Sequence, residues 1–192
     1  MSLIHLIRHG QPLSGWGEPG GSPDPGLSPA GMLEAQAAAQ ALSALPAGER
    51  PTRVLTSPLR RCRETAAPFA ALLGVDPVVE PAVAEIATPE GVVGEDRAPW
   101  LRKAMGGTWG GVEGLDGEAW RAAVVAALLQ AEGAAVFTHF VAINAAVTAA
   151  LRSPDVLAFK PAPGSVTTLR VQDGGLHLLK LGAALPEAGR VL

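Results

Sequence analysis

The chain has 192 residues, a formal net charge of −3 and 48% hydrophobic residues. This composition argues against a disordered chain, and the lack of a dense basic run argues against nucleic acid or an anionic membrane as the main partner. The one cysteine, Cys62, excludes an internal disulfide and fits a reducing compartment. No stretch resembles a signal peptide or approaches the ~18 apolar residues of a membrane span. We therefore expect a single cytoplasmic domain over residues 1–192.

Hydrophobic patterning and turn residues predict strands that alternate with helices. Short apolar strands are expected at 2–7, 52–56, 77–80 and 134–138. Helices are expected at 29–45, 59–74, 117–133 and 139–151, with a kink or break at Pro68. Residues 165–181 predict a closing hairpin that turns at 173–175. This alternation indicates a three-layer α/β/α sandwich around a largely parallel mixed sheet.

A stretch rich in glycine and proline, residues 86–117, interrupts this pattern. We expect it to be a variable insertion with one short helix, and to carry substrate specificity, because loops on a rigid scaffold carry recognition. The glycines around Trp109 would suit a mobile lid. Four aromatic side chains would form an apolar wall for the leaving group, or alternatively only close the core: Trp16, Trp100, Trp109 and Phe140.

Basic side chains follow three of the predicted strands. In chain order they are Arg8 with His9, Arg60 with Arg61, and His139. The carboxyl ends of the strands of an open α/β sheet form one edge, and ligands bind there. We therefore expect these side chains to line one anion-binding pocket.

The second predicted helix begins with three arginines, Arg60, Arg61 and Arg63. The helix dipole favours acidic residues at this end, so the arginines break a local rule. An anion bound by the helix N-terminus and the guanidinium groups would remove the conflict. The alternative is that the arginines are solvated or pair with Glu34 or Glu64.

Four motifs, in this order, resemble the histidine phosphatase superfamily, which includes the phosphoglycerate mutases. They are LIRHG at 6–10, SPLRRCRETA at 57–66, VAEI at 83–86 and TH at 138–139. The stretch GLSPAGMLEAQA at 26–37 resembles the helix after the family's first loop. The resemblance runs from about residue 4 to about residue 179 and implies a phosphoglycerate mutase-like fold.

The resemblance also implies a role for each matching residue. His9 would be the nucleophile that accepts the phosphoryl group, and Glu85 would be the proton donor. His139 would donate a hydrogen bond to the phosphoryl group. Three further side chains would bind the phosphate: Arg8, Arg61 and Gln11.

These residue types suit phosphomonoester hydrolysis without a metal ion or other cofactor. Nearby arginines disfavour protonation of His9 and neutralise charge on the phosphoryl oxygens in flight. A phosphohistidine divides the transfer into two steps, in which a carboxyl group first protonates the leaving alcohol and then helps water attack. The expected function is a histidine acid phosphatase-like phosphomonoesterase that acts on a small phosphorylated metabolite or a phosphoprotein.

The sequence departs from the family pattern at Gly17, where asparagine is frequent, and at Phe140, where glycine commonly follows the histidine. The chain is also short for a phosphoglycerate mutase, which favours hydrolysis over mutase-type phosphotransfer. The same residues would also suit a non-catalytic phosphate-binding scaffold, and Cys62 would suit a redox or signalling protein. The sequence names no substrate and leaves a homodimer open.

Overall fold

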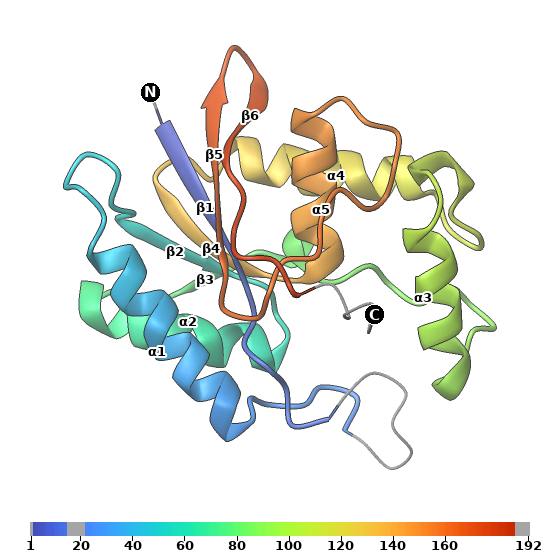
Figure 1. Ribbon diagram of the computed structural model, residues 1–192, viewed down its shortest axis with the longest axis horizontal. Helices are drawn as coiled ribbons and strands as arrows, with labels where there is room; N and C mark the ends of the chain where they lie inside the picture. The colour runs from blue at the N-terminus through green and yellow to red at the C-terminus, as the bar shows by residue number, and fades with distance from the viewer. Residues whose placement is uncertain (1, 15–21, 187–192) are drawn as a thin grey trace, which may run out of the picture.

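A mixed sheet of six strands forms the middle of the computed structural model, which describes residues 2–14 and 22–186 (Figure 1). The strands are β1 (Ser2–Arg8), β2 (Arg53–Thr56), β3 (Val78–Val79), β4 (Ala134–Thr138), β5 (Val166–Gln172) and β6 (Gly175–Lys180). They lie in the order β3-β2-β4-β1-β5-β6. The pairs from β3 to β1 are parallel, whereas β5 and β6 are antiparallel additions. The predicted largely parallel sheet and closing hairpin are thus confirmed.

Helices cover both faces of the sheet. They are α1 (Pro29–Ser43), α2 (Arg60–Leu73), α4 (Gly117–Leu129) and α5 (Phe140–Ala150). In Figure 1, α1 and α2 lie on one face, and α4 and α5 lie on the other. Along β4, Ala134 and Val136 join the core beneath α4 and α5, whereas Ala135 and Phe137 join the core beneath α1 and α2. The predicted three-layer sandwich is confirmed.

Local sequence signals set the ends of the helices. Ser28 caps α1, because its Oγ accepts a hydrogen bond from the Gly31 N–H at 3.1 Å. Gly74 ends α2 in the left-handed conformation, with φ of 67°. Of the kink or break expected at Pro68, the break does not occur, since α2 continues to Leu73 with Phe69 buried in the core. No helix of the described residues is both long and apolar enough to cross a lipid bilayer.

The segment 86–117 contains more structure than its composition indicates. It holds α3 (Arg97–Met105) and the 3₁₀ helices η2 (Gly94–Asp96) and η3 (Trp109–Gly111); a further one, η1 (Pro81–Val83), precedes it. Trp109 is fully buried, and its Nε1 donates to the Thr148 Oγ1 in α5 at 3.0 Å. Trp100 is also buried, and its Nε1 donates to the Glu113 carbonyl oxygen at 3.0 Å. Both indoles therefore close the core and do not form a wall for the substrate.

The start of α1 packs tightly against the chain that follows β1. A Cβ on Gly31 would clash with the Gln11 carbonyl oxygen, and a Cβ on Gly10 would lie 2.5 Å from the Gly31 carbonyl oxygen. One hydrogen bond holds this approach, because the Ser28 N–H donates to the Gln11 carbonyl oxygen at 2.9 Å. A second, from the Gly10 N–H to the Thr65 Oγ1 at 3.0 Å, ties the same loop to α2. The contact fixes the backbone just beyond the carboxyl end of β1.

Replacing Gly31 by alanine should therefore destabilise the protein, although alanine is the better helix former by about 1 kcal/mol. The added methyl group meets backbone atoms, and overpacking of this kind costs about 1–3 kcal/mol. Urea unfolding of Gly31→Ala and wild type measures the loss. Gly48→Ala is the matched control, because a Cβ there meets nothing within 4 Å. Equal stability of wild type and Gly31→Ala would contradict the tight contact.

Candidate functional site

The carboxyl ends of β1, β4 and β2 meet at one edge of the sheet, because these strands are parallel neighbours. Arg8 lies opposite Thr138 in the register of β1 and β4, so the next residues, His9 and His139, are adjacent. The His9 N–H donates to the Thr138 carbonyl oxygen at 2.9 Å. Ser57 follows β2 in the same way. The first residues after these three strands, His9, His139 and Ser57, therefore lie close together.

His9 is 4% exposed, and its ring lies edge-on to that of His139 with 5.1 Å between centroids. Its Nδ1 lies 2.8 Å from the Gly10 carbonyl oxygen, which only accepts, so Nδ1 carries the proton and Nε2 has the unshared electron pair. Burial lowers the pKa of His9 to about 3, although this hydrogen bond acts to raise it. The charges of Arg61 and Arg8 lower this pKa further by smaller amounts. His9 is therefore a neutral imidazole with a nucleophilic Nε2 at neutral pH.

Two arginines flank the histidines. Arg8 donates from Nη1 to the Pro161 carbonyl oxygen at 2.7 Å, and its Cζ lies 5.1 Å from the centre of the Phe140 ring. Arg61, in the first turn of α2, is 3% exposed and donates from Nη2 to the His139 Nδ1 at 3.3 Å. Among the described residues, neither buried Nε of these two arginines has a hydrogen-bond partner. Buried donors are normally paired, so these two Nε–H groups are unusual, and they lie on the two arginines that flank the histidines.

Glu85 brings a carboxyl group to the same pocket. It is 7% exposed, and its Oε1 accepts from the Ile86 N–H at 3.0 Å. Its Oε2 is buried and makes no hydrogen bond of ordinary geometry to a described residue, and the backbone N–H of Val141 also interacts with the carboxyl group. Burial raises the pKa of Glu85, although the hydrogen bond from Ile86 acts to lower it. Burial lowers the pKa of Arg8, and the nearby Glu85 acts to raise it. A carboxyl group that keeps its proton to higher pH is suited to proton donation.

Asp24 occupies the N-terminus of α2, where the sequence indicated an external anion. Its two carboxylate oxygens accept from the Arg60 N–H at 2.9 and 3.0 Å, and Oδ1 lies 3.7 Å from the Arg61 Nη1. The exposed Arg60 side chain pairs with Glu64 at 2.6 Å, which was one of the two interpretations of this arginine. A carboxylate of the chain itself therefore satisfies this helix end, and Arg61 points to the histidines.

Two further residues at the site were not candidates from the sequence. Ser57 is fully buried, and its Oγ lies 2.8 Å from the His139 Nε2. Its position directly after β2 is a signal that could have identified it, since His9 holds the same position after β1. Arg97 begins α3, and its Nη2 donates to the Ile86 carbonyl oxygen at 3.1 Å. No spacing in the glycine-rich insertion pointed to it.

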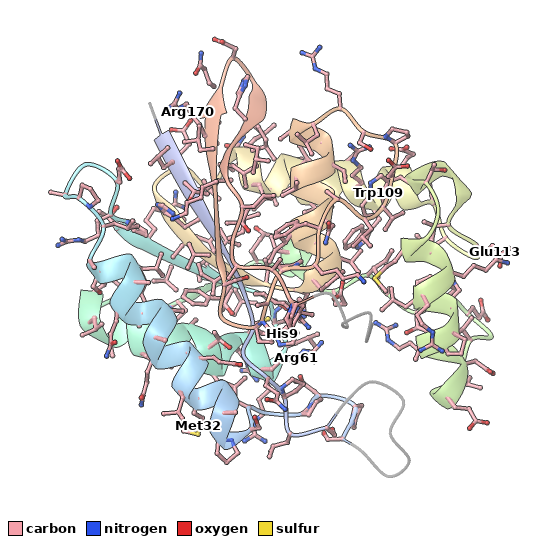
Figure 2. The ribbon with its side chains drawn as sticks, viewed as in Figure 1. His9, Met32, Arg61, Trp109, Glu113 and Arg170 are labelled. Carbon is pink, nitrogen blue, oxygen red and sulfur yellow. The ribbon has the colours of Figure 1, made fainter. Side chains whose placement is uncertain are left out.

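The predicted aromatic wall is only partly present. Figure 2 shows His9 and Arg61 close together at the end of the sheet, and Trp109 well away from them. Phe140 is half-buried beneath the Arg8 guanidinium and so lies next to the site. The fold thus separates the rings of the insertion from the ring that begins α5.

Three other positions of the first loop were of interest. Gln11 is exposed, and its backbone N–H donates to the Glu34 Oε2 at 2.7 Å. A contact between its side chain and phosphate therefore stays a prediction. Trp16 and Gly17 lie outside the described residues.

Cys62 lies at the base of the site as a neutral thiol. It is fully buried, with Sγ 3.3 Å from the His139 Nε2. Burial raises the pKa of the Cys62 thiol, which disfavours the thiolate that nucleophilic or redox chemistry needs. Within residues 2–14 and 22–186, no group of three or more histidine, cysteine, aspartate or glutamate side chains is placed to hold a metal ion.

Comparison with known proteins places this geometry in a family. Among solved structures, phosphoserine phosphatase from Entamoeba histolytica, in complex with 3-phosphoglyceric acid, has a TM-score of 0.75 and 20% identity, covering 96% of this chain and 98% of its own. A mycobacterial glucosyl-3-phosphoglycerate phosphatase has a TM-score of 0.73 and 21% identity, covering 96% and 100%. These likenesses confirm the predicted fold. A search of curated proteins gives no match. The family model of the histidine phosphatase superfamily (branch 1) matches residues 4–184, and the chain belongs to this superfamily.

Proposed function

We propose that the protein is a metal-independent phosphomonoesterase that passes the phosphoryl group of its substrate to the His9 Nε2 and then to water. One observation carries the proposal. The neutral, nucleophilic His9 lies beside Arg8 and Arg61, whose buried Nε donors have no partner among the described residues. A phosphoryl dianion placed there would meet donors from both arginines and a nucleophile at its phosphorus.

In the first proposed step, the His9 Nε2 attacks phosphorus while the bond from phosphorus to the alcohol oxygen breaks. Protonated Glu85 gives its proton to that oxygen. Arg8 and Arg61 offset the charge of the phosphoryl oxygens in the transition state. In the second step, the Glu85 carboxylate takes a proton from water as the water oxygen attacks phosphorus and the phosphorus–nitrogen bond breaks. The products are an alcohol and inorganic phosphate.

The proposed substrate is a small phosphorylated metabolite or a phosphoprotein in the cytoplasm. Both neighbours named above are called phosphatases in their descriptions, and each matches this chain over nearly its whole length. Their descriptions therefore favour hydrolysis over mutase-type phosphotransfer. Phe140 is the proposed contact for the organic part of the substrate, since it lies beneath Arg8.

The purified protein should hydrolyse p-nitrophenyl phosphate in the presence of a chelator, and His9→Ala should abolish this activity. The expected reason is that cationic side chains, and no metal ion, stabilise the transferred group. Release of p-nitrophenol measures the rate. His177→Ala is the matched control, because His177 is exposed on β6. Loss of activity on chelation, or a His9→Ala enzyme that still turns over, would contradict the proposal.

Arg61→Ala should lower kcat by at least ~100-fold, the scale for one preorganised charge contact. Arg63→Ala changes an exposed arginine of the same helix and should leave kcat nearly unchanged. Steady-state kinetics on the same aryl phosphate compares the two. Equal effects of the two substitutions on kcat would contradict the role proposed for Arg61.

The pH dependence of kcat/KM should depend on Glu85. The first step needs protonated Glu85, so the rate should fall as pH rises through the raised pKa of this carboxyl group. The first step also needs neutral His9, which the pKa of about 3 provides down to strongly acidic pH. Glu85→Gln should remove the part of this fall that comes from the carboxyl group, and should slow alkyl phosphates more than p-nitrophenyl phosphate, whose leaving group needs less protonation. A variant that keeps the wild-type pH profile would assign the proton donor elsewhere.

A further inference from the structure

The His139 imidazole is held so that the position of its proton is determined. Its Nδ1 lies 3.3 Å from the Arg61 Nη2, and because an arginine only donates, Nδ1 accepts. A neutral ring then carries its proton on Nε2, which faces the Ser57 Oγ at 2.8 Å and the Cys62 Sγ at 3.3 Å. His139 is therefore the Nε2–H tautomer, with its Nδ1 electron pair directed to Arg61.

Ser57 is placed to accept the Nε2–H, and its Oγ is itself held by the Leu59 N–H at 3.3 Å. The Cys62 Sγ lies 3.3 Å from Nε2 and 3.9 Å from Nδ1, so the sulfur packs against the ring, out of line with the Nε2–H. Its thiol donates to the Thr138 carbonyl oxygen at 3.5 Å. Ser57 is therefore the group that holds the proton on Nε2.

An anion held by Arg61 would change the balance at Nδ1. The Arg61 donors would turn to the anion, and the Nδ1 electron pair would then face an anion oxygen, which only accepts. A proton on Nδ1 would convert this repulsion into a charge-assisted hydrogen bond. In the free protein, burial lowers the pKa of His139 well below its usual value, and neighbouring cations add to this; a bound dianion acts in the opposite sense.

We propose that a tetrahedral dianion binds together with one proton from solvent, which enters at the His139 Nδ1, and that Ser57 is a positioning residue that keeps the other proton on Nε2. The inference rests on the phosphoryl site proposed above. The proton returns to solvent when the anion leaves, so no proton is gained or lost over a binding cycle. The titratable and charged groups that face His139 from the surrounding elements are His9, Arg8, Arg61, Cys62 and Arg97.

Sulfate is the probe, because it stays a dianion near neutral pH and any proton taken up then belongs to the protein. Titration calorimetry in buffers of different ionisation enthalpy counts the protons. We expect uptake of about one proton, and an affinity that rises about tenfold per unit fall in pH between the lowered pKa of free His139 and its higher pKa in the complex. Sulfate binding without proton uptake overturns this inference alone, whereas no sulfate binding at any pH overturns the phosphoryl site as well.

Two asparagine variants identify the residue that takes the proton. In His139→Asn, the amide places a neutral N–H near the Nδ1 position and cannot gain a proton, so sulfate should bind without uptake. In His9→Asn, the amide keeps a donor for the Gly10 carbonyl oxygen, and uptake should continue. Uptake lost in His9→Asn and kept in His139→Asn overturns the assignment. In the wild-type protein, nitrogen NMR of the His139 ring should change from the Nε2–H tautomer to the imidazolium when sulfate is added.

Ser57→Ala tests the positioning role. Loss of the acceptor for Nε2–H should weaken sulfate binding by at least about tenfold, the scale of a hydrogen bond to a charged group, and move the pH dependence to lower pH. Ser57→Thr keeps the hydroxyl group and should restore both. A Ser57→Ala protein with unchanged pH dependence of sulfate binding overturns the role of Ser57, whatever its stability.

Discussion

The burial of Arg8 and Arg61 against two imidazole rings is the constraint on which the rest of the site depends. Guanidinium groups are seldom buried without partners. Here Arg8 donates to the Pro161 carbonyl oxygen, and Arg61 contacts the His139 Nδ1 and pairs with the Asp24 carboxylate at 3.7 Å. Their Nε donors stay unsatisfied within the described residues. The same two charges help to keep both histidines neutral. The charge of the site is therefore held in place by the fold itself.

The fold holds this arrangement through backbone contacts that need particular residues. Thr65 accepts from the Gly10 N–H and donates to the Arg61 carbonyl oxygen at 2.6 Å, so one side chain of α2 ties the loop after β1 to the first turn of α2. Gly31 lets α1 approach the same loop from the other side. Asp24 satisfies the N-terminus of α2. The chain beyond β1 is therefore fixed by α1, by α2 and by the sheet.

The sequence predicted the elements and the strand ends well because both depend on local patterns. Parallel strands place their carboxyl ends at one edge, so the strand pattern was enough to predict that His9 and His139 meet. Asp24 and Trp109 could not be placed in this way. Asp24 reaches α2 from a loop whose path depends on tertiary packing, and Trp109 is buried because α4 and α5 offer it a stacking partner and a hydroxyl group. An insertion rich in glycine and tryptophan can form either a mobile lid or part of the core, so its composition does not distinguish the two.

Two histidines of the same pocket, both deeply buried, are suited to different work because their Nδ1 atoms face opposite partners. The His9 Nδ1 faces a carbonyl oxygen and must carry the proton, so Nε2 is left to attack. The His139 Nδ1 faces an arginine and must not carry it, so the proton lies on Nε2 against Ser57 and the Nδ1 is left to respond to an anion. Burial does not distinguish the two rings, because it lowers the pKa of each. The difference between the two rings comes from which group each backbone turn and helix places beside a single nitrogen atom.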